Sequence, residues 1–313
     1  TAPAYKPPRT KQKGRTVESA VLLFSDWHVG EVVNPVEMGG LNRYDFDVFC
    51  ARLQHVTDTV RRFTTENMSQ HDFPELHILH LGDFVSGTIH EETSETNMLN
   101  ITEQATLGAY VAAQSIRELA GVFPRVYVTC VVGNHGRTTK RVRFKQRAQL
   151  NFDHLAYNYM ALLLKQQTNV TFRIPLSFWC AVEIAGHNFH LAHGEDIRGF
   201  AGFPWYGAGR SKARWLEIGA VQRDFFRYFV RAHFHTKMSQ QTATGEMIFN
   251  GSLVGGNEYA LGMPDYGDPI QLLFGVHREK GKSWELPINA RFAPTSSRYD
   301  YRRDVSLAEQ VAE

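Results

Sequence analysis

Mostly apolar segments alternate with amphipathic ones in the first half of the chain. The pattern predicts strands at residues 20–25, 76–81 and 126–132 and helices at residues 45–66 and 102–120. Each expected strand is a short apolar run of the kind found in sheets that are buried on both faces. Residues 45–66 carry apolar side chains at spacings of three and four behind Asp45, which suits a helix capped by an aspartate. This alternation predicts a parallel sheet whose strands all end at one edge.

The pattern changes in the second half, where short strands follow one another. A helix is expected at 151–166, and strands at 170–174, 178–184, 188–193, 228–232, 246–249, 271–278 and 283–287. Ala185-Gly186-His187 is a hairpin signal between two of these strands, so we expect the second half to begin as antiparallel sheet. Residues 194–215 are rich in glycine and aromatic residues, and we expect a loop there that leads into a helix.

Composition places these elements in an ordinary globular protein. Of the 313 residues, 43% are hydrophobic and 21% are charged, which is sufficient for a sizeable core. We expect an extended basic arm at 1–18, one folded domain at 19–295, which holds the candidate chemistry described below, and a surface tail at 296–313. The formal charge of +2 neither favours nor excludes a polyanionic partner, so only local clusters of charge can indicate one.

The sequence predicts a cytoplasmic protein with no membrane partner. No apolar stretch is long enough to span a bilayer, and the basic residues 1–15 lack the apolar core of a signal peptide. Cys50, Cys130 and Cys180 lie far apart and form no C-x-x-C pair, which favours reduced thiols in the core. The sequence does not indicate an oligomeric state.

Polar residues with the chemistry of metal ligands follow several of the expected strands. They are Asp26 and His28, Asp83, Asn134 and His135, His193, and His233 and His235. Carboxylates and amides supply oxygen ligands, imidazoles supply nitrogen ligands, and a carboxylate can bridge two ions. Two ions about 3.5–4 Å apart can polarise phosphoryl oxygens and acidify a water for in-line attack. The strand ends therefore predict a dinuclear metal centre.

This ordered set resembles the calcineurin-like metallophosphoesterases, whose pattern reads D-x-H, G-D, G-N-H, H and G-H-x-H. The resemblance covers residues 20–252. It implies an α/β (α+β) fold, a four-layer αββα sandwich of two mixed β-sheets flanked by helices.

The resemblance also implies the role of each ligand. One metal ion would be held by Asp26, His28 and His235, the other by Asn134, His193 and His233, and Asp83 would bridge both. His135 would contact the phosphoryl group and protonate the leaving oxygen. Two divalent ions are expected. Mn²⁺ is favoured, because nucleases that share this pattern commonly use it, and Fe or Zn²⁺ also suits these ligands.

The chain departs from the family pattern after Gly133-Asn134-His135. The family usually has an acidic residue there, whereas this chain has Gly136 and Arg137. His135 therefore lacks a neighbouring carboxylate that could orient it. We expect Arg137 to hold a substrate phosphate with its planar set of donors, and we place it with His135 among the predicted catalytic residues.

Basic and aromatic residues near these motifs indicate a class of substrate. Residues 137–147 hold six basic side chains in eleven, which suits either contact with phosphates beyond the scissile one or a solvated helix face. The stretch 200–215 suits either base stacking or a lid packed on the core, and we expect Trp205 and Tyr206 to be exposed. The predicted substrate contacts are Arg137, Lys140, Arg141, Trp205, Tyr206 and Arg210.

The sequence thus favours a hydrolase, a two-metal phosphodiesterase or nuclease that cleaves a nucleotide or nucleic-acid substrate with a metal-bridging hydroxide. A phosphomonoesterase acting on phosphoproteins or small molecules is the alternative, because the same family includes both. A nucleic-acid-binding accessory subunit with a vestigial metal site is a third reading. The complete set of ligands argues against it.

Overall fold

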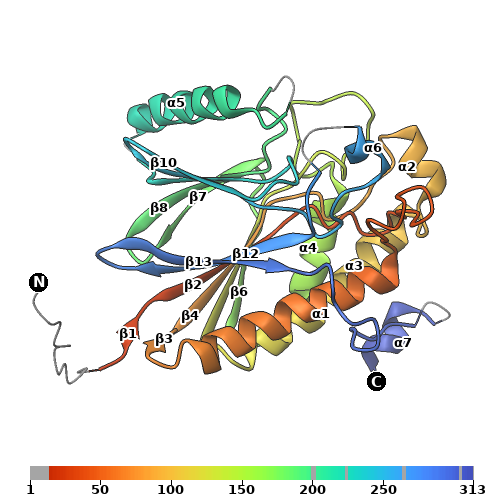
Figure 1. The fold of residues 1–313 in the computed structure, drawn as a ribbon, viewed down its shortest axis with the longest axis horizontal. Helices are drawn as coiled ribbons and strands as arrows, with labels where there is room; N and C mark the ends of the chain where they lie inside the picture. The colour runs from red at the N-terminus through yellow and green to blue at the C-terminus, as the bar shows by residue number, and fades with distance from the viewer. Residues whose placement is uncertain (1–13, 199–201, 223–224, 263–265, 303–304, 313) are drawn as a thin grey trace, which may run out of the picture.

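The protein is described here by a computed structural model, which covers residues 14–198, 202–222, 225–262, 266–302 and 305–312. Two mixed β-sheets lie face to face, and helices cover the outer face of each (Figure 1). The predicted four-layer αββα sandwich is confirmed.

The first sheet has six strands in the order β13-β12-β2-β4-β5-β6. Their bounds are β2 Ser19–Phe24, β4 Glu75–His80, β5 Arg125–Cys130, β6 Val170–Arg173, β12 Ile270–His277 and β13 Gly281–Asn289. Strands β2, β4, β5 and β6 pair in parallel, which confirms the predicted parallel sheet. The expectation that residues 170–174 open an antiparallel sheet is wrong, because β6 pairs with β5 and extends the first sheet instead.

The second sheet has five strands in the order β10-β11-β9-β8-β7. Their bounds are β7 Trp179–Ile184, β8 His187–Ala192, β9 Tyr228–Arg231, β10 Met238–Thr242 and β11 Gly245–Phe249. The predicted hairpin joins β7 to β8 through Ala185 and Gly186, both of which have positive φ, as a type I′ turn requires. Strand β10 was not predicted. It is a polar edge strand without the apolar alternation that marks a buried one.

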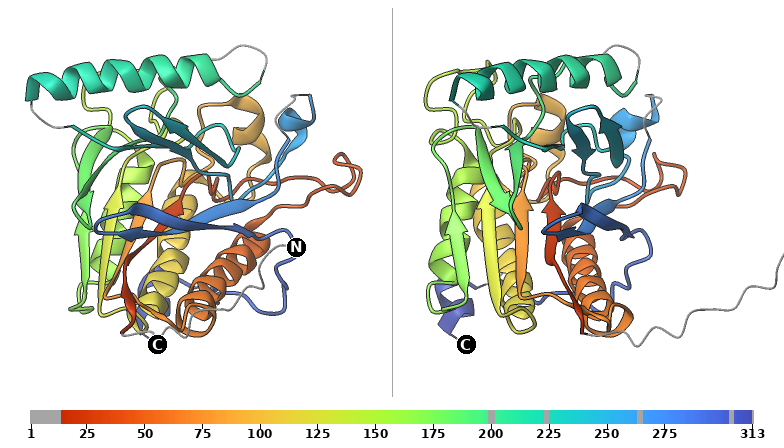
Figure 2. Two further views of the ribbon diagram at one scale, coloured as in Figure 1. Left: turned by 60° about the vertical axis from the view of Figure 1, so that its left-hand side comes forward. Right: turned by 90° about the vertical axis from the view of Figure 1, so that its left-hand side faces the viewer.

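Helices cover both outer faces of the sandwich. The longer ones are α1 Phe46–Arg62, which continues as a π-helical turn at Phe63–Asn67, α3 Ile101–Ala120, α4 Phe152–Leu163 and α5 Trp205–Gln222. The short ones are α2 Glu91–Thr96, α6 Glu258–Leu261 and α7 Leu307–Ala312. Figures 1 and 2 show α1 and α3 beneath the first sheet and α5 across the outer face of the second. Within the described ranges, no helix combines the length and the apolar character needed to cross a membrane.

Three apolar layers hold the four structural layers together. The largest packs α1, α3 and α4 on the first sheet, a second fills the space between the sheets, and a third lies between the second sheet and α5. Cys50, Cys130 and Cys180 are buried free thiols, as predicted. The predicted aspartate cap is also present, since Asp45 accepts a hydrogen bond from the Val48 backbone at the start of α1.

The two ends of the chain attach to the sandwich in different ways. Most of the predicted N-terminal arm, residues 1–13, lies outside the described residues; β1 (Thr16–Val17) pairs with β3 (His71–Asp72) in a small parallel sheet. The segment expected as a surface tail is held against α1 and α3 by two tyrosines. Tyr299 is 6% exposed and bonds to Glu118, and the Tyr301 hydroxyl bonds to Asp47.

Candidate metal centre

All the predicted ligands lie just beyond the carboxyl ends of parallel strands. Asp26 and His28 follow β2, Asp83 follows β4, Asn134 and His135 follow β5, His193 follows β8, and His233 and His235 follow β9. Strands β2, β4 and β5 are parallel in the first sheet, and β8 and β9 are parallel in the second. The two sheets therefore bring their strand ends, and these polar residues, to one common edge.

The backbone at these residues has an unusual conformation. Seven non-glycine residues of the described chain have positive φ, and five of them are predicted ligands: Asp26, His28, Asp83, His233 and His235. A side chain raises the energy of this left-handed region, so such residues persist only where the surrounding structure imposes the conformation. Their concentration at one place indicates a functional site.

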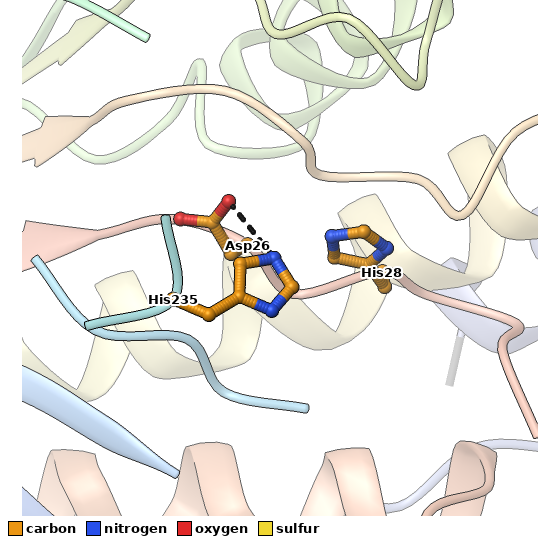
Figure 3. A group of neighbouring side chains, drawn as sticks. All are labelled: Asp26, His28 and His235. Atoms are coloured by element: carbon orange, nitrogen blue, oxygen red, sulfur yellow. Dashed lines mark ion pairs between the residues drawn. The ribbon is translucent and has the colours of Figure 1, made fainter. Parts of the chain in front are cut away.

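The first group of ligands consists of Asp26, His28 and His235, which Figure 3 shows side by side. Their donor atoms lie within 4.8 Å of one another. Asp26 Oδ1 is 3.4 Å from His235 Nε2, and the rings of His28 and His235 are 5.0 Å apart. Asp26 and His28 are buried and His235 is 25% exposed, so the group opens to solvent on the His235 side.

The second group consists of Asp83, His193 and His233. Asp83 Oδ2 lies 3.0 Å from His193 Nε2, which in turn lies 3.2 Å from His233 Nδ1. His193 Nδ1 donates to the Leu81 carbonyl at 2.7 Å, so its tautomer is fixed and Nε2 is available to a metal ion. The same Asp83 oxygen lies 3.9 Å from His28 Nε2 of the first group, which agrees with the expected bridging position.

The donor atoms fit divalent cations. Two buried polar atoms here, His28 Nε2 and Asn134 Oδ1, have no hydrogen-bond partner among the described residues. Unpaired buried polar atoms are costly, and coordination by a cation removes that cost. Oxygen and nitrogen ligands in this mixture suit Mn²⁺, Fe and Zn²⁺ alike.

Charge interactions within the site oppose the effect of burial. Burial alone lowers the pKa of His193, but Asp83 raises it overall to about 10. Burial likewise lowers the pKa of His28, and Glu31 raises it overall to about 9. For Asp83, burial raises the pKa, but His193 and His135 bring it well below its usual value. Metal binding at this site must displace protons from histidines, as metal ligands generally require.

His135 lies beside the first group but is held differently. Its Nδ1 donates to the Ser86 carbonyl at 2.8 Å, which leaves Nε2 with a lone pair in the neutral ring. Its backbone N–H donates to Asp83 Oδ1, and its ring lies 4.4 Å from that of His28. Burial lowers the pKa of His135 to about 4 against the raising effect of Asp83. The role of His135 as a proton donor to the leaving group stays a prediction.

Asp153 is a site residue that sequence reasoning missed. It lies in the first turn of α4, and its fully buried carboxylate accepts hydrogen bonds from four backbone N–H groups, those of Asp83, Phe84, Val85 and Gly133. One carboxylate thus joins the loop of Asp83 to the loop of Asn134. No sequence motif signals this, because 70 residues separate Asp153 from Asp83.

Two further carboxylates also escaped prediction. Glu31 is 5% exposed, lies 3.0 Å from His28 Nδ1 and accepts a hydrogen bond from the Asn257 amide. Glu195 follows His193 by two residues and forms an ion pair with Arg147. Carboxylates in such positions orient metal-binding histidines and neighbouring cations. Their closeness in sequence to His28 and His193 is the signal that could have identified them.

The predicted basic substrate contacts lie on an irregular loop. Residues 137–147 do not form a helix, so the solvated helix face considered from the sequence is wrong; after an isolated bridge between Arg137 and Asn151 the segment consists of bends and turns. Arg137 is half-buried beside the metal loops. Lys140 and Arg141 are exposed, and Lys140 lies 3.6 Å from Glu91.

The predicted aromatic contacts lie at the start of α5. Trp205 is 53% and Tyr206 79% exposed, as expected from the sequence, and the Arg210 guanidinium lies 5.7 Å from the Tyr206 ring centre. Trp205 contacts Phe203, which contacts Phe234 between the two ligands of the β9 loop. The start of α5 is therefore packed against the metal loops, and its contact with substrate stays a prediction.

The fold and the clustering of the ligands are those that the resemblance to calcineurin-like metallophosphoesterases implies. No family model and no curated protein matches the chain. Similar solved structures include an archaeal phosphodiesterase, with 13% identity and a TM-score of 0.38 over 86% of this chain and 99% of that one. A hypothetical protein from Pyrococcus horikoshii has 11% identity and a TM-score of 0.41 over 88% of each chain.

Vps29 from Entamoeba histolytica, in complex with zinc, has 11% identity and a TM-score of 0.31 over 86% of this chain and 99% of that one. Identities and scores of this size assign no activity to the chain.

Proposed function

We propose that the protein is a metal-dependent phosphoesterase and, more narrowly, a phosphodiesterase acting on a nucleotide or nucleic acid. One observation carries the proposal: Asp83 Oδ2 lies 3.9 Å from His28 Nε2 and 3.0 Å from His193 Nε2, so one carboxylate connects two groups of buried donor atoms. A carboxylate shared by two such groups is the arrangement that a two-metal phosphoesterase needs.

Two divalent cations, when bound, supply Lewis acidity toward a phosphoryl oxygen and lower the pKa of a water molecule. The residues of the chain hold the other reacting groups. Arg137 has a buried Nε that finds no hydrogen-bond partner among the residues that the structure describes, and its guanidinium can hold a phosphoryl oxygen. His135 Nε2 can exchange a proton with the ester oxygen while Nδ1 stays fixed on the Ser86 carbonyl.

The substrate class follows from the charge around the centre. Residues 137–147, which begin two residues after His135, carry six basic side chains, and exposed aromatic rings stand at the start of α5. Cationic side chains with exposed rings suit a backbone of phosphodiesters with stacked bases. Mn²⁺ is the ion we favour.

A comparison of two chromogenic substrates under Mn²⁺ tests the proposal. Bis(p-nitrophenyl) phosphate is a diester and p-nitrophenyl phosphate a monoester. We expect the diester to be hydrolysed with the higher kcat/KM, and Asp83→Asn or chelation by EDTA to abolish turnover. Hydrolysis of the monoester alone would assign a phosphomonoesterase. A chain that binds no divalent ion and hydrolyses neither substrate would assign a binding subunit instead.

A further inference from the structure

The loop that follows the metal ligands encloses a hollow lined by cations. Residues 137–150 line a shallow hollow that is open to solvent and has an inner volume of about 10 Å³, enough for one water molecule. Four of its lining side chains are basic: Arg137, Arg143, Lys145 and Arg147. Like charges gathered around one space repel each other unless an anion lies among them.

Backbone contacts define the shape of the hollow. Arg137 bridges to Asn151 at the start of α4, and Thr138 N–H donates to the Leu150 carbonyl, so the two ends of the loop are joined. Leu150 N–H donates to the carbonyl of Gln146, which has a φ of 54°. A non-glycine residue with this φ is one that the surrounding structure holds in place. The cations are therefore brought together by a closed loop.

The negative charge at the hollow does not match the positive charge. Glu195 is paired with Arg147, and both side chains are about nine-tenths buried. No carboxylate of the described residues forms an ion pair with Arg137, Arg143 or Lys145. In addition, Arg137 Nε is buried and has no hydrogen-bond partner in the described chain. Three cations, one of which carries this buried donor, thus remain for an external anion.

We propose that the mouth of this hollow, where Arg143 and Lys145 are exposed, is a second phosphate subsite, which binds a phosphate adjacent to the one at the metal centre. It adjoins that centre, because Arg137 N–H donates to the Asn134 carbonyl and because Arg147, in its wall, is paired with Glu195, two residues after His193. The proposal rests on the proposed phosphodiesterase function and narrows its substrate to one with at least two phosphates, as in a nucleotide chain. Arg143 and Lys145 hold the second phosphate, and Arg147 is fixed against Glu195 as part of the wall.

Two chromogenic diesters that differ by one phosphate test the subsite. Thymidine 5′-(p-nitrophenyl phosphate) carries only the scissile phosphate, and its 3′-phosphorylated form carries a second. For the wild-type chain we expect a higher kcat/KM with the second phosphate. Arg143→Gln and Lys145→Gln should each reduce that advantage by about tenfold, the value of one hydrogen bond to a charged group. Arg278→Gln, in the exposed turn between β12 and β13, removes the same charge elsewhere and should leave the advantage intact.

A binding measurement separates failure of the subsite from failure of the proposed function. Thymidine 3′,5′-bisphosphate and thymidine 5′-monophosphate are titrated by calorimetry into protein treated with EDTA. Tighter binding of the bisphosphate, lost in Arg143→Gln and Lys145→Gln but kept in Arg278→Gln, supports the subsite even if the chain hydrolyses nothing. Equal affinity for the two nucleotides in the wild type, or equal losses in all three variants, would overturn it.

Discussion

Gly133 lies where the two loops of the metal centre touch, and one added methyl group there should disable the centre. A Cβ at Gly133 would overlap the Oδ1 and backbone nitrogen of Asp83 and lie 2.8 Å from Asp83 Cγ, closer than the 3.0 Å that real Cβ atoms keep. The loop cannot move aside freely. Gly133 N–H donates to Asp153 Oδ2 at 2.8 Å, and His135 N–H donates to Asp83 Oδ1 at 2.8 Å.

The cost of Gly133→Ala follows from these contacts. Overpacking a close contact costs roughly 1–3 kcal/mol, and the loss of two short hydrogen bonds adds about 1 kcal/mol each. We therefore expect the free energy of unfolding to fall by about 3–5 kcal/mol, a large part of the total for a typical domain. We also expect Asp83 to leave the position that joins the two ligand groups, so that metal affinity falls as well.

Urea unfolding with and without Mn²⁺ checks both expectations. Wild-type protein should gain stability as Mn²⁺ rises, because an ion that binds only the folded state stabilises it. Gly133→Ala should be less stable in EDTA and gain little from the ion. Gly209→Ala is the matched control, since a Cβ there meets nothing within 4 Å, and helix propensity should make it about 1 kcal/mol more stable. Wild-type stability and a full Mn²⁺ response in Gly133→Ala would refute the reasoning.

Three further predictions follow from other parts of the structure. In Asp153→Asn an amide faces the backbone N–H donors, so the free energy of unfolding should fall by about 2–4 kcal/mol and Mn²⁺ binding measured by calorimetry should weaken. Asp45→Asn, at a helix cap that tolerates Asn, should change neither quantity. Burial lowers the pKa of His80 to about 3. At His80 the unfolded chain therefore takes up a proton that the fold excludes, which contributes a fall in the free energy of unfolding of about 1.4 kcal/mol per pH unit from pH 6 to pH 4. Urea titrations at each pH should show the slope reduced by that amount in His80→Phe. Arg137→Ala should raise KM more for a dinucleotide than for bis(p-nitrophenyl) phosphate, and equal effects would place Arg137 at the scissile phosphate alone or in folding.

The sequence by itself determined the parallel core and the set of candidate metal ligands. Near-continuous apolar runs mark β2, β4 and β5, and each is followed within a few residues by polar groups of metal-binding chemistry. Because parallel strands end at one edge, the order of motifs along the chain already predicted that Asp26, Asp83 and Asn134 would meet. Local periodicity and a known direction of strands were sufficient for this.

Tertiary structure alone decided the rest, because it depends on contacts between distant residues. The pattern at 170–173 describes a strand but not its partner, and pairing with β5 placed it in the first sheet. Asp153 bonds to loops that are 20 and 70 residues away, so its role has no local signal. The cations of residues 137–147 were visible as a cluster, whereas the closed loop that turns them toward one hollow, and the pairing of Arg147 with Glu195, exist only in the folded chain.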